Sequence, residues 1–115
     1  MTDATQAIGK VEIDTKKIGI DILCLSGHKM YAPKGIGALY VKNGIKLSAY
    51  THGGGHENGL RSGTLNVPGI IALGKACKIA EQEMKQDAER INLLRNELEN
   101  ELLKLPDTFV NGCKH

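Results

Sequence analysis

A long apolar repeat in the second half of the chain constrains the fold more than any other feature. Between Pro68 and Leu105, apolar residues recur every three or four positions, which is the period of an amphipathic helix. Pro68 suits a first helical turn, and Pro106 marks the end. At about 1.5 Å per residue the helix is roughly 55 Å long, more than a single domain of this size is wide. We therefore expect further protein along it, and we expect residues 69–80, which carry almost no charge, to be deeply buried.

Short apolar runs in the first half predict a few strands. Residues 20–25 are typical of a buried strand, and residues 35–41 predict a second strand that is buried on both faces. Asn43-Gly44 is a strong hairpin signal, so a third strand is expected over residues 45–50. Together with the long helix, these strands predict an α/β fold.

Weaker signals mark a cap and a last strand. Asp14 can cap a short turn through residues 15–17, and residues 108–110 read as the start of another strand. The strand expected before Asp3 is missing, and three candidate strands leave too little sheet to cover the apolar stripe of the helix. We expect the chain to be a fragment from the middle of a larger protein.

Composition excludes several kinds of partner. The formal net charge is +2 and aromatic residues make up 3% of the chain, which disfavours a basic, base-stacking nucleic-acid surface. No apolar run approaches the roughly 20 residues of a membrane span. The three cysteines, Cys24, Cys77 and Cys113, form neither a disulfide framework nor a zinc-ligand pattern. We expect a cytoplasmic protein that binds neither nucleic acid nor membrane.

The segment Ser26-Gly27-His28-Lys29 directly follows the first predicted strand. A lysine at the edge of a buried region is suited to Schiff-base chemistry, because burial lowers the pKa of its amine. Small polar residues beside it leave backbone N–H groups available to an anion. The alternative is a strand end followed by an ordinary turn with a solvated lysine, and these four residues alone do not decide between the two.

Residues 51–63 predict a loop, since they hold five glycines and show no helical or strand period. His52, His56 and Glu57 raise the possibility of a metal site. Two histidines four residues apart face the same way only on a helix, and three consecutive glycines between them oppose a helix. We expect no metal site here.

Three parts of the sequence suit pyridoxal 5′-phosphate. Lys29 offers an amine for the aldehyde, Asp3 offers a carboxylate for the pyridine nitrogen, and hydroxyl groups lie in the lysine segment and in Arg61-Ser62-Gly63-Thr64. The spacing of these residues permits this interpretation without requiring it.

Three motifs together resemble one family. They are Asp3-Ala4-Thr5-Gln6; Ser26-Gly27-His28-Lys29 with residues 33–37 (Pro-Lys-Gly-Ile-Gly); and residues 53–57 (Gly-Gly-Gly-His-Glu) with 61–64 (Arg-Ser-Gly-Thr). In this order, the motifs resemble the NifS/IscS-like cysteine desulfurases of the class V aminotransferase family. The similarity extends from Thr2 to about Leu105. It implies the large domain of a pyridoxal-phosphate enzyme of fold type I.

The resemblance implies a role for each matching residue. Lys29 would be the catalytic residue, binding the cofactor's aldehyde and later moving the proton of the substrate's Cα. Asp3 would pair with the pyridinium nitrogen, and Thr64 would reach the phosphate bound in the other subunit of a homodimer. Arg61 would support the loop or the dimer, with contact to the substrate as the alternative. Thr64 can instead serve simply as a residue at the start of the long helix, and both roles are compatible. The implied cofactor-binding residues are Asp3, Gln6, Ser26, Gly27, His28, Lys29 and Thr64.

The resemblance also implies a reaction and its partners. Sulfur would be removed from L-cysteine, leaving L-alanine and an enzyme persulfide that passes sulfur to an iron–sulfur scaffold or another acceptor. The family's sulfur-accepting cysteine lies on a loop beyond the long helix, and none of Cys24, Cys77 and Cys113 matches it. We therefore expect the 115-residue chain alone to be inactive. Alternatives are another class V enzyme, such as an aminotransferase or selenocysteine lyase, and a non-catalytic remnant or interaction module.

The same resemblance implies a division of the chain. Residues 1–67 would belong to the cofactor-binding large domain, residues 68–105 would form the interdomain helix, and residues 106–115 would begin a truncated small domain.

Overall fold

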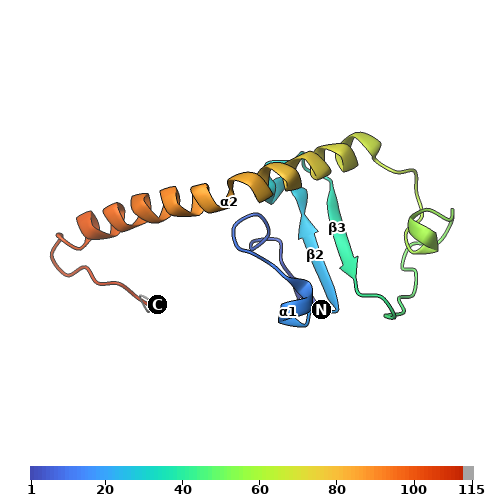
Figure 1. Ribbon diagram of the computed structural model, residues 1–115, viewed down its shortest axis with the longest axis horizontal. Coiled ribbons are helices and arrows are strands. Elements are labelled where there is room, and N and C mark those ends of the chain that lie inside the picture. Colours follow the sequence, from blue (N-terminus) through green and yellow to red (C-terminus); the bar gives the residue numbers. More distant parts are fainter. Residues whose placement is uncertain (113–115) are drawn as a thin grey trace. The chain divides into compact units, whose positions relative to one another are not determined.

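The computed structural model describes residues 1–112 (Figure 1). Its elements follow the order β1, α1, β2, η1, β3, η2 and α2, where η marks a short 3₁₀ helix. The chain divides into two compact units, residues 1–82 and residues 83–115. This division falls inside α2 rather than at one of its ends, and the assignment of the segments to a large and a small domain stays a prediction. Cys113 lies outside the described residues.

A three-stranded mixed sheet forms the first unit's framework. Strand β2 (Ile22–Ser26) is central, with β1 (Thr2–Asp3) parallel to it on one side and β3 (Gly37–Val41) antiparallel on the other. The α/β class and the two longer strands are thereby confirmed, with β2 and β3 each beginning two residues later than predicted. The sequence pattern indicated no strand before Asp3, whereas Thr2 and Asp3 form the two-residue strand β1.

Two predicted strands are wrong. The Asn43-Gly44 turn does form, and the N–H of Ile45 donates to the carbonyl of Lys42 at 3.1 Å. Residues 45–50 nevertheless form no strand, and neither do residues 108–110. The turn signal specifies one local hydrogen bond, whereas a strand also needs a neighbour with which to pair. Burial of β3 on both faces is also wrong, because Leu39 is 51% exposed and Ala38 is exposed.

Both helices begin as their sequences indicate. Helix α1 (Thr15–Ile18) starts after Asp14, whose carboxylate accepts the N–H groups of Lys16 and Lys17 at 2.9 and 3.0 Å, so the predicted cap is confirmed. The predicted long helix is also confirmed, as α2 (Val67–Leu102), starting one residue earlier and ending three residues sooner than the sequence pattern. The Asn66 side chain accepts the Gly69 N–H at 3.1 Å and thus caps its first turn.

The core of the first unit lies between α2 and the segment after β2. Met30, Leu73 and Ala76 are buried together, with partly buried apolar neighbours Ile8, Leu25, Ala32, Ile36 and Ala80. Deep burial was expected for all of residues 69–80, and it is found only on the face of α2 that carries Leu73 and Ala76. Ile71 is 66% exposed and Cys77 is exposed, because one narrow face of the helix contacts the rest of the unit.

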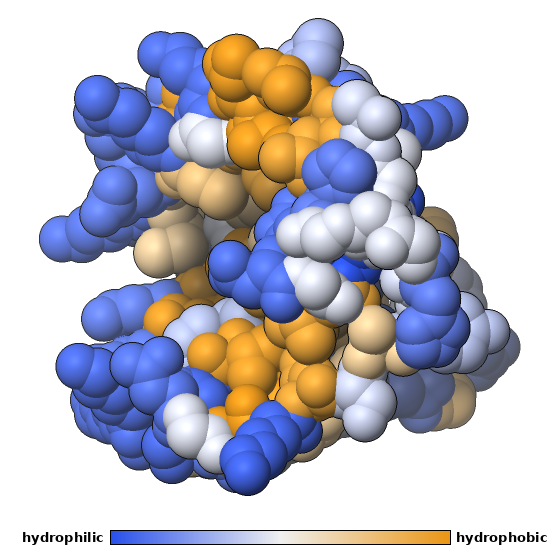
Figure 2. All heavy atoms as spheres, turned by 90° about the vertical axis from the view of Figure 1, so that its right-hand side faces the viewer, coloured by the Kyte–Doolittle hydropathy of each residue, from blue (hydrophilic) through white to orange (hydrophobic). Residues whose placement is uncertain are grey.

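Apolar side chains also lie on the surface (Figure 2). Those exposed by 40% or more include Leu60, Leu65, Val67 and Ile70.

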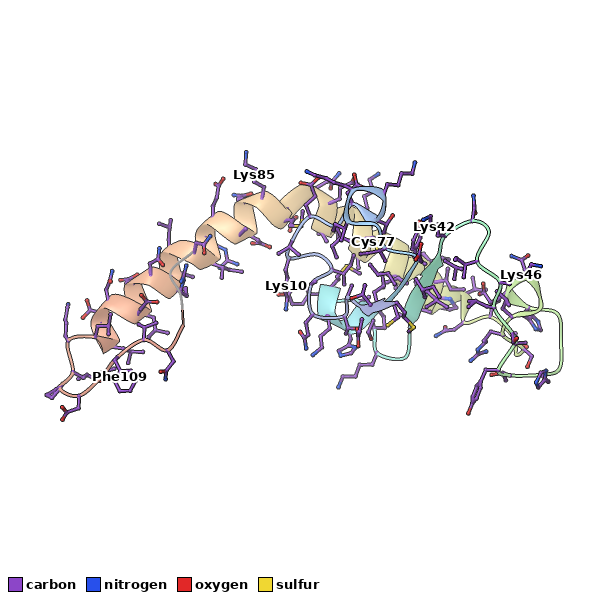
Figure 3. The ribbon with its side chains drawn as sticks, turned by 90° about the horizontal axis from the view of Figure 1, so that it is seen from below. Lys10, Lys42, Lys46, Cys77, Lys85 and Phe109 are labelled. Atoms are coloured by element: carbon purple, nitrogen blue, oxygen red, sulfur yellow. The ribbon has the colours of Figure 1, made fainter. Side chains whose placement is uncertain are left out.

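In the second unit, Phe109 lies beside the C-terminal turns of α2 (Figure 3). Together with Leu98, Leu102 and other residues, it lines a hollow of about 270 Å³.

Among residues 1–112, no helix combines the length and the apolar composition that a membrane span requires.

Candidate functional site

The sheet brings two of the three motifs to one edge. Strands β1 and β2 are parallel, with Asp3 paired to Cys24, and they end at Asp3 and Ser26 respectively. Helix η1 (Gly27–Met30) continues directly from β2 and carries His28 and Lys29. The carboxyl ends of parallel strands are the usual place for ligands in α/β sheets. Asp3 and the lysine segment therefore occupy the edge at which a bound ligand is expected.

Packing against α2 fixes the position of η1. The Gly27 N–H donates to the carbonyl of Ile36 at 2.9 Å. A Cβ on Gly27 would lie 3.0 Å from Ile36 Cγ2 and 3.1 Å from Leu73 Cδ1, so only glycine fits this approach without displacement of its neighbours. Met30 is buried in the core at the other end of η1. Lys29, between them, is half-buried on a short rigid segment.

Ser26 and His28 form a direct pair. The Ser26 Oγ lies 2.7 Å from the His28 Nδ1, across the junction between β2 and η1. The hydroxyl and the imidazole are thus held together at the carboxyl end of β2, and His28 is exposed to solvent. A hydroxyl beside an imidazole gives a donor set suited to an oxyanion such as a phosphate.

Asp3 is hydrogen-bonded within its own motif. Its Oδ1 accepts the backbone N–H of Thr5 at 2.8 Å. Hydrogen bonds from Thr5, first from its side chain and then from its backbone, hold the pKa of the Asp3 carboxyl below the ordinary value of 3.8. The carboxylate is therefore ionised at neutral pH. Sequence reasoning missed Thr5, although a threonine two residues after an aspartate is a recognisable local hydrogen-bonding pattern.

Gln6 and Thr64 are placed less closely with the rest of the predicted site. Gln6 is exposed in the turns that follow β1, and Thr64 is exposed just before α2. Among residues 1–112, no hydrogen bond joins either side chain to Asp3 or to the lysine segment. The structure thus brings together Asp3, Ser26, Gly27, His28 and Lys29 at one edge, and among residues 1–112 it shows no hydrogen bond from the Gln6 or Thr64 side chain to them.

The glycine-rich segment is a loop, as predicted, with one short 3₁₀ helix, η2 (Glu57–Gly59). A bridge between Thr51 and Arg61 joins its two ends, and the Ser62 hydroxyl donates to the carbonyl of His52 at 2.9 Å. Figure 1 shows this loop to the side of β3, in green. The backbone bonds fix the course of the loop that leads to Thr64.

The described cysteines occupy structural positions. The Cys24 thiol lies in β2 and donates to the carbonyl of Thr2 at 3.8 Å. Cys77 lies on the exposed side of α2. Neither thiol lies on a loop beside the lysine segment.

The chemistry of the edge residues fits pyridoxal phosphate. The group needs an amine for its aldehyde, an anion for its ring nitrogen and donors for its phosphate. Lys29, a half-buried residue, supplies an amine, Asp3 supplies a carboxylate that stays ionised, and Ser26 with His28 supplies a hydroxyl and an imidazole. All four come from the ends of two adjacent strands, which is the arrangement that a single ligand requires.

Comparison with known proteins gives one consistent family. The family described as Aminotransferase class-V matches residues 1–115. Among curated proteins, the chain is similar to the cysteine desulfurase IscS of Haemophilus influenzae, with 49% identity over 112 residues. These residues cover 96% of this chain and 28% of that relative, so the chain spans little more than a quarter of the relative's length.

Solved structures give the same result for the fold. A NifS-like protein from Rickettsia africae is similar with a TM-score of 0.87 and 32% identity, over 91% of this chain and 29% of that one. A structure of SspA in complex with cysteine is similar with a TM-score of 0.63 and 51% identity, over 66% of this chain and 22% of that one. The sheet and long helix are thus those of the NifS-like, fold type I architecture.

Proposed function

The chain belongs to the class V aminotransferase family, and we propose that it supplies the cofactor-anchoring part of a cysteine desulfurase. The observation that carries the proposal is the placement of Asp3 and the Lys29 segment at the ends of adjacent parallel strands. The names of the similar proteins, cysteine desulfurase IscS and SspA in complex with cysteine, support L-cysteine as the substrate class.

Each edge residue has a defined task in this proposal. The Lys29 Nζ would bind the cofactor's aldehyde and, once the substrate's amine had taken its place, the freed amine would accept and return the proton from the substrate's Cα. The Asp3 carboxylate stays ionised and would hold a proton on the ring nitrogen, while the paired Ser26 and His28 would bind the phosphate. When bound, pyridoxal phosphate withdraws electrons from the bonds of the substrate's Cα. Gln6 would hydrogen-bond the ring's phenolic oxygen.

The sulfur-accepting thiol is proposed to lie outside these 115 residues. The Cys24 thiol is directed at the Thr2 carbonyl inside the sheet, and Cys77 lies on a helix rather than on a loop. An attacking thiolate needs access to the substrate's sulfur, which neither position supports. The chain alone is therefore expected to release no alanine or sulfide from cysteine.

Assembly and partners follow from the same proposal. The parent protein is a cytoplasmic homodimer that passes sulfur to an iron–sulfur scaffold or another acceptor. Thr64 reaches the phosphate bound in the other subunit, and its exposure just before α2 supports an intersubunit role.

A segment exchange tests the function directly. Residues 1–112 would replace the matching segment of the Haemophilus influenzae cysteine desulfurase, to which the chain is 49% identical. We expect the chimaera to release alanine from L-cysteine, and its Lys29→Ala variant to release none. A folded chimaera that takes up the cofactor but prefers a different amino acid in a substrate screen would instead support another class V enzyme. A folded chimaera without cofactor uptake would support a non-catalytic role.

A further inference from the structure

The hydrogen bonds at the end of β1 single out Thr5. The Asp3 Oδ1 accepts the Thr5 backbone N–H at 2.8 Å, and the Thr5 side chain is the largest cause of the lowered pKa of the Asp3 carboxyl. The proposed function gives Asp3 a task that depends on its charge and direction, yet the family motif assigned nothing to Thr5. A hydrogen bond from a backbone N–H to an ionised carboxylate is a strong one, and it restricts the direction of the carboxylate.

Thr5 is itself held in a rigid turn. The preceding Ala4 is 4% exposed, and its N–H donates to the carbonyl of Cys24 at 2.9 Å. The Ala4 carbonyl accepts the N–H groups of both Ala7 and Ile8 at 2.9 Å. Both peptide groups of Ala4 are thus tied, one to β2 and the other to the following turn. The Thr5 N–H belongs to the same peptide group as the Ala4 carbonyl, so the backbone fixes its direction.

We propose that Thr5 is a positioning residue for Asp3, whose N–H and hydroxyl fix the direction of the Asp3 carboxylate at the carboxyl end of β1. That Asp3 is thereby directed at the ring nitrogen of a bound cofactor rests on the proposed function. The hydrogen bond between Thr5 and Asp3 does not rest on it, because both residues belong to this chain.

From β2, the titratable group that faces Asp3 is the Cys24 thiol, its partner in the parallel ladder. The Cys24 side chain also lowers the pKa of the Asp3 carboxyl, but it contributes less than Thr5 does. Cys24→Ala should therefore raise the pKa of Asp3 by less than removal of the Thr5 hydroxyl does.

Titration of the cofactor-free chain by NMR tests the link. In the unaltered chain we expect the Thr5 amide proton to shift with the same midpoint as the Asp3 carboxyl carbon, because the two groups share a hydrogen bond. This measurement needs no substitution. A Thr5 amide that does not respond to the ionisation of Asp3 would overturn the proposal.

Substitutions then separate the hydroxyl from the side-chain bulk. We expect Thr5→Val to raise the pKa of Asp3 toward its ordinary value, Thr5→Ser to preserve the lowered pKa, and the matched control Thr108→Val, in the second unit, to leave it unchanged. If the pKa of Asp3 is the same in Thr5→Val as in the unaltered chain, the Thr5 hydroxyl does not act on Asp3. If the pKa of Asp3 rises as much in Thr5→Ser as in Thr5→Val, the hydroxyl is again ruled out.

Loading with pyridoxal phosphate distinguishes the two proposals. We expect the absorption spectrum of the loaded chimaera described above to change in Thr5→Val and to recover in Thr5→Ser. Absence of cofactor uptake by the unaltered chimaera would count against the proposed function, while the NMR result on the Thr5–Asp3 link would stand. Normal uptake with no linked titration would leave the function intact and reject the role of Thr5.

Discussion

Gly37 lies directly against the carbonyl group of Leu25, so that a Cβ at Gly37 would be 2.5 Å from the Leu25 oxygen. Gly37 is the first residue of β3 and pairs with Ser26, the last residue of β2. The clash would be with backbone, which cannot move aside as a side chain can. The pairing beside the lysine segment therefore depends on glycine at this position.

The first prediction is that Gly37→Ala destabilises the first unit. We expect the free energy of unfolding to fall by about 1–3 kcal/mol, as overpacking commonly costs. The matched control is Gly74→Ala in α2, where an added Cβ meets nothing within 4 Å. Alanine there should stabilise the helix by roughly 0.5–1 kcal/mol. Urea unfolding followed by circular dichroism measures both changes, and equal shifts in the same direction would contradict the prediction.

A second prediction concerns the contact between α2 and η1. Leu73 is 9% exposed and packs with Met30 and Ala76 beneath the lysine segment. Leu73→Ala should lower the free energy of unfolding by about 2 kcal/mol or more, because it leaves a cavity in a small core. Ile71→Ala, on the same helix but largely exposed, should change it by less than roughly 0.5 kcal/mol. Similar urea midpoints for the two variants would show that α2 does not pack on η1 through Leu73.

A third prediction follows from the lowered pKa of Asp3. The unfolded chain binds a proton at this carboxyl more readily than the folded chain does. The stability that Asp3 contributes is therefore fully present above the unfolded value of about 3.8, and it is lost as the pH falls from there through the folded value.

Thermal melts of Asp3→Asn and the unaltered chain between neutral and strongly acidic pH check this sign. The two curves should converge as the pH falls, since only the unaltered chain loses the contribution of the Asp3 carboxylate. Curves that stay parallel throughout would contradict it.

The parts of the fold that are set by local pattern could be predicted from the sequence. The period of apolar residues predicted α2, and the carboxylate of Asp14 predicted the start of α1. The strand expected over residues 45–50 failed for a physical reason. Asn43-Gly44 determines a turn, but β3 pairs with β2 on one side, and among residues 1–112 no strand pairs with its other side. Burial of β3 also depends on neighbours that a sequence pattern does not supply.

The candidate site was predicted residue by residue, but its internal bonds were not. The motifs named Asp3, Ser26, His28 and Lys29, and the sheet brings all four to one edge. The Ser26–His28 pair and the Thr5–Asp3 bond depend on how the chain turns at the ends of β2 and β1. Spacing alone could have suggested each bond without showing that it forms.

The most direct test of the account is the identity of the lysine that binds pyridoxal phosphate. The chimaera would be incubated with the cofactor, reduced with borohydride, digested and examined by peptide mass spectrometry. The account predicts the reduced cofactor on Lys29, its retention in Lys34→Ala, where a nearby exposed lysine is removed, and its loss in Lys29→Ala. Labelling of Lys34, or unchanged labelling after Lys29→Ala, would contradict the central claim that Lys29 anchors the cofactor.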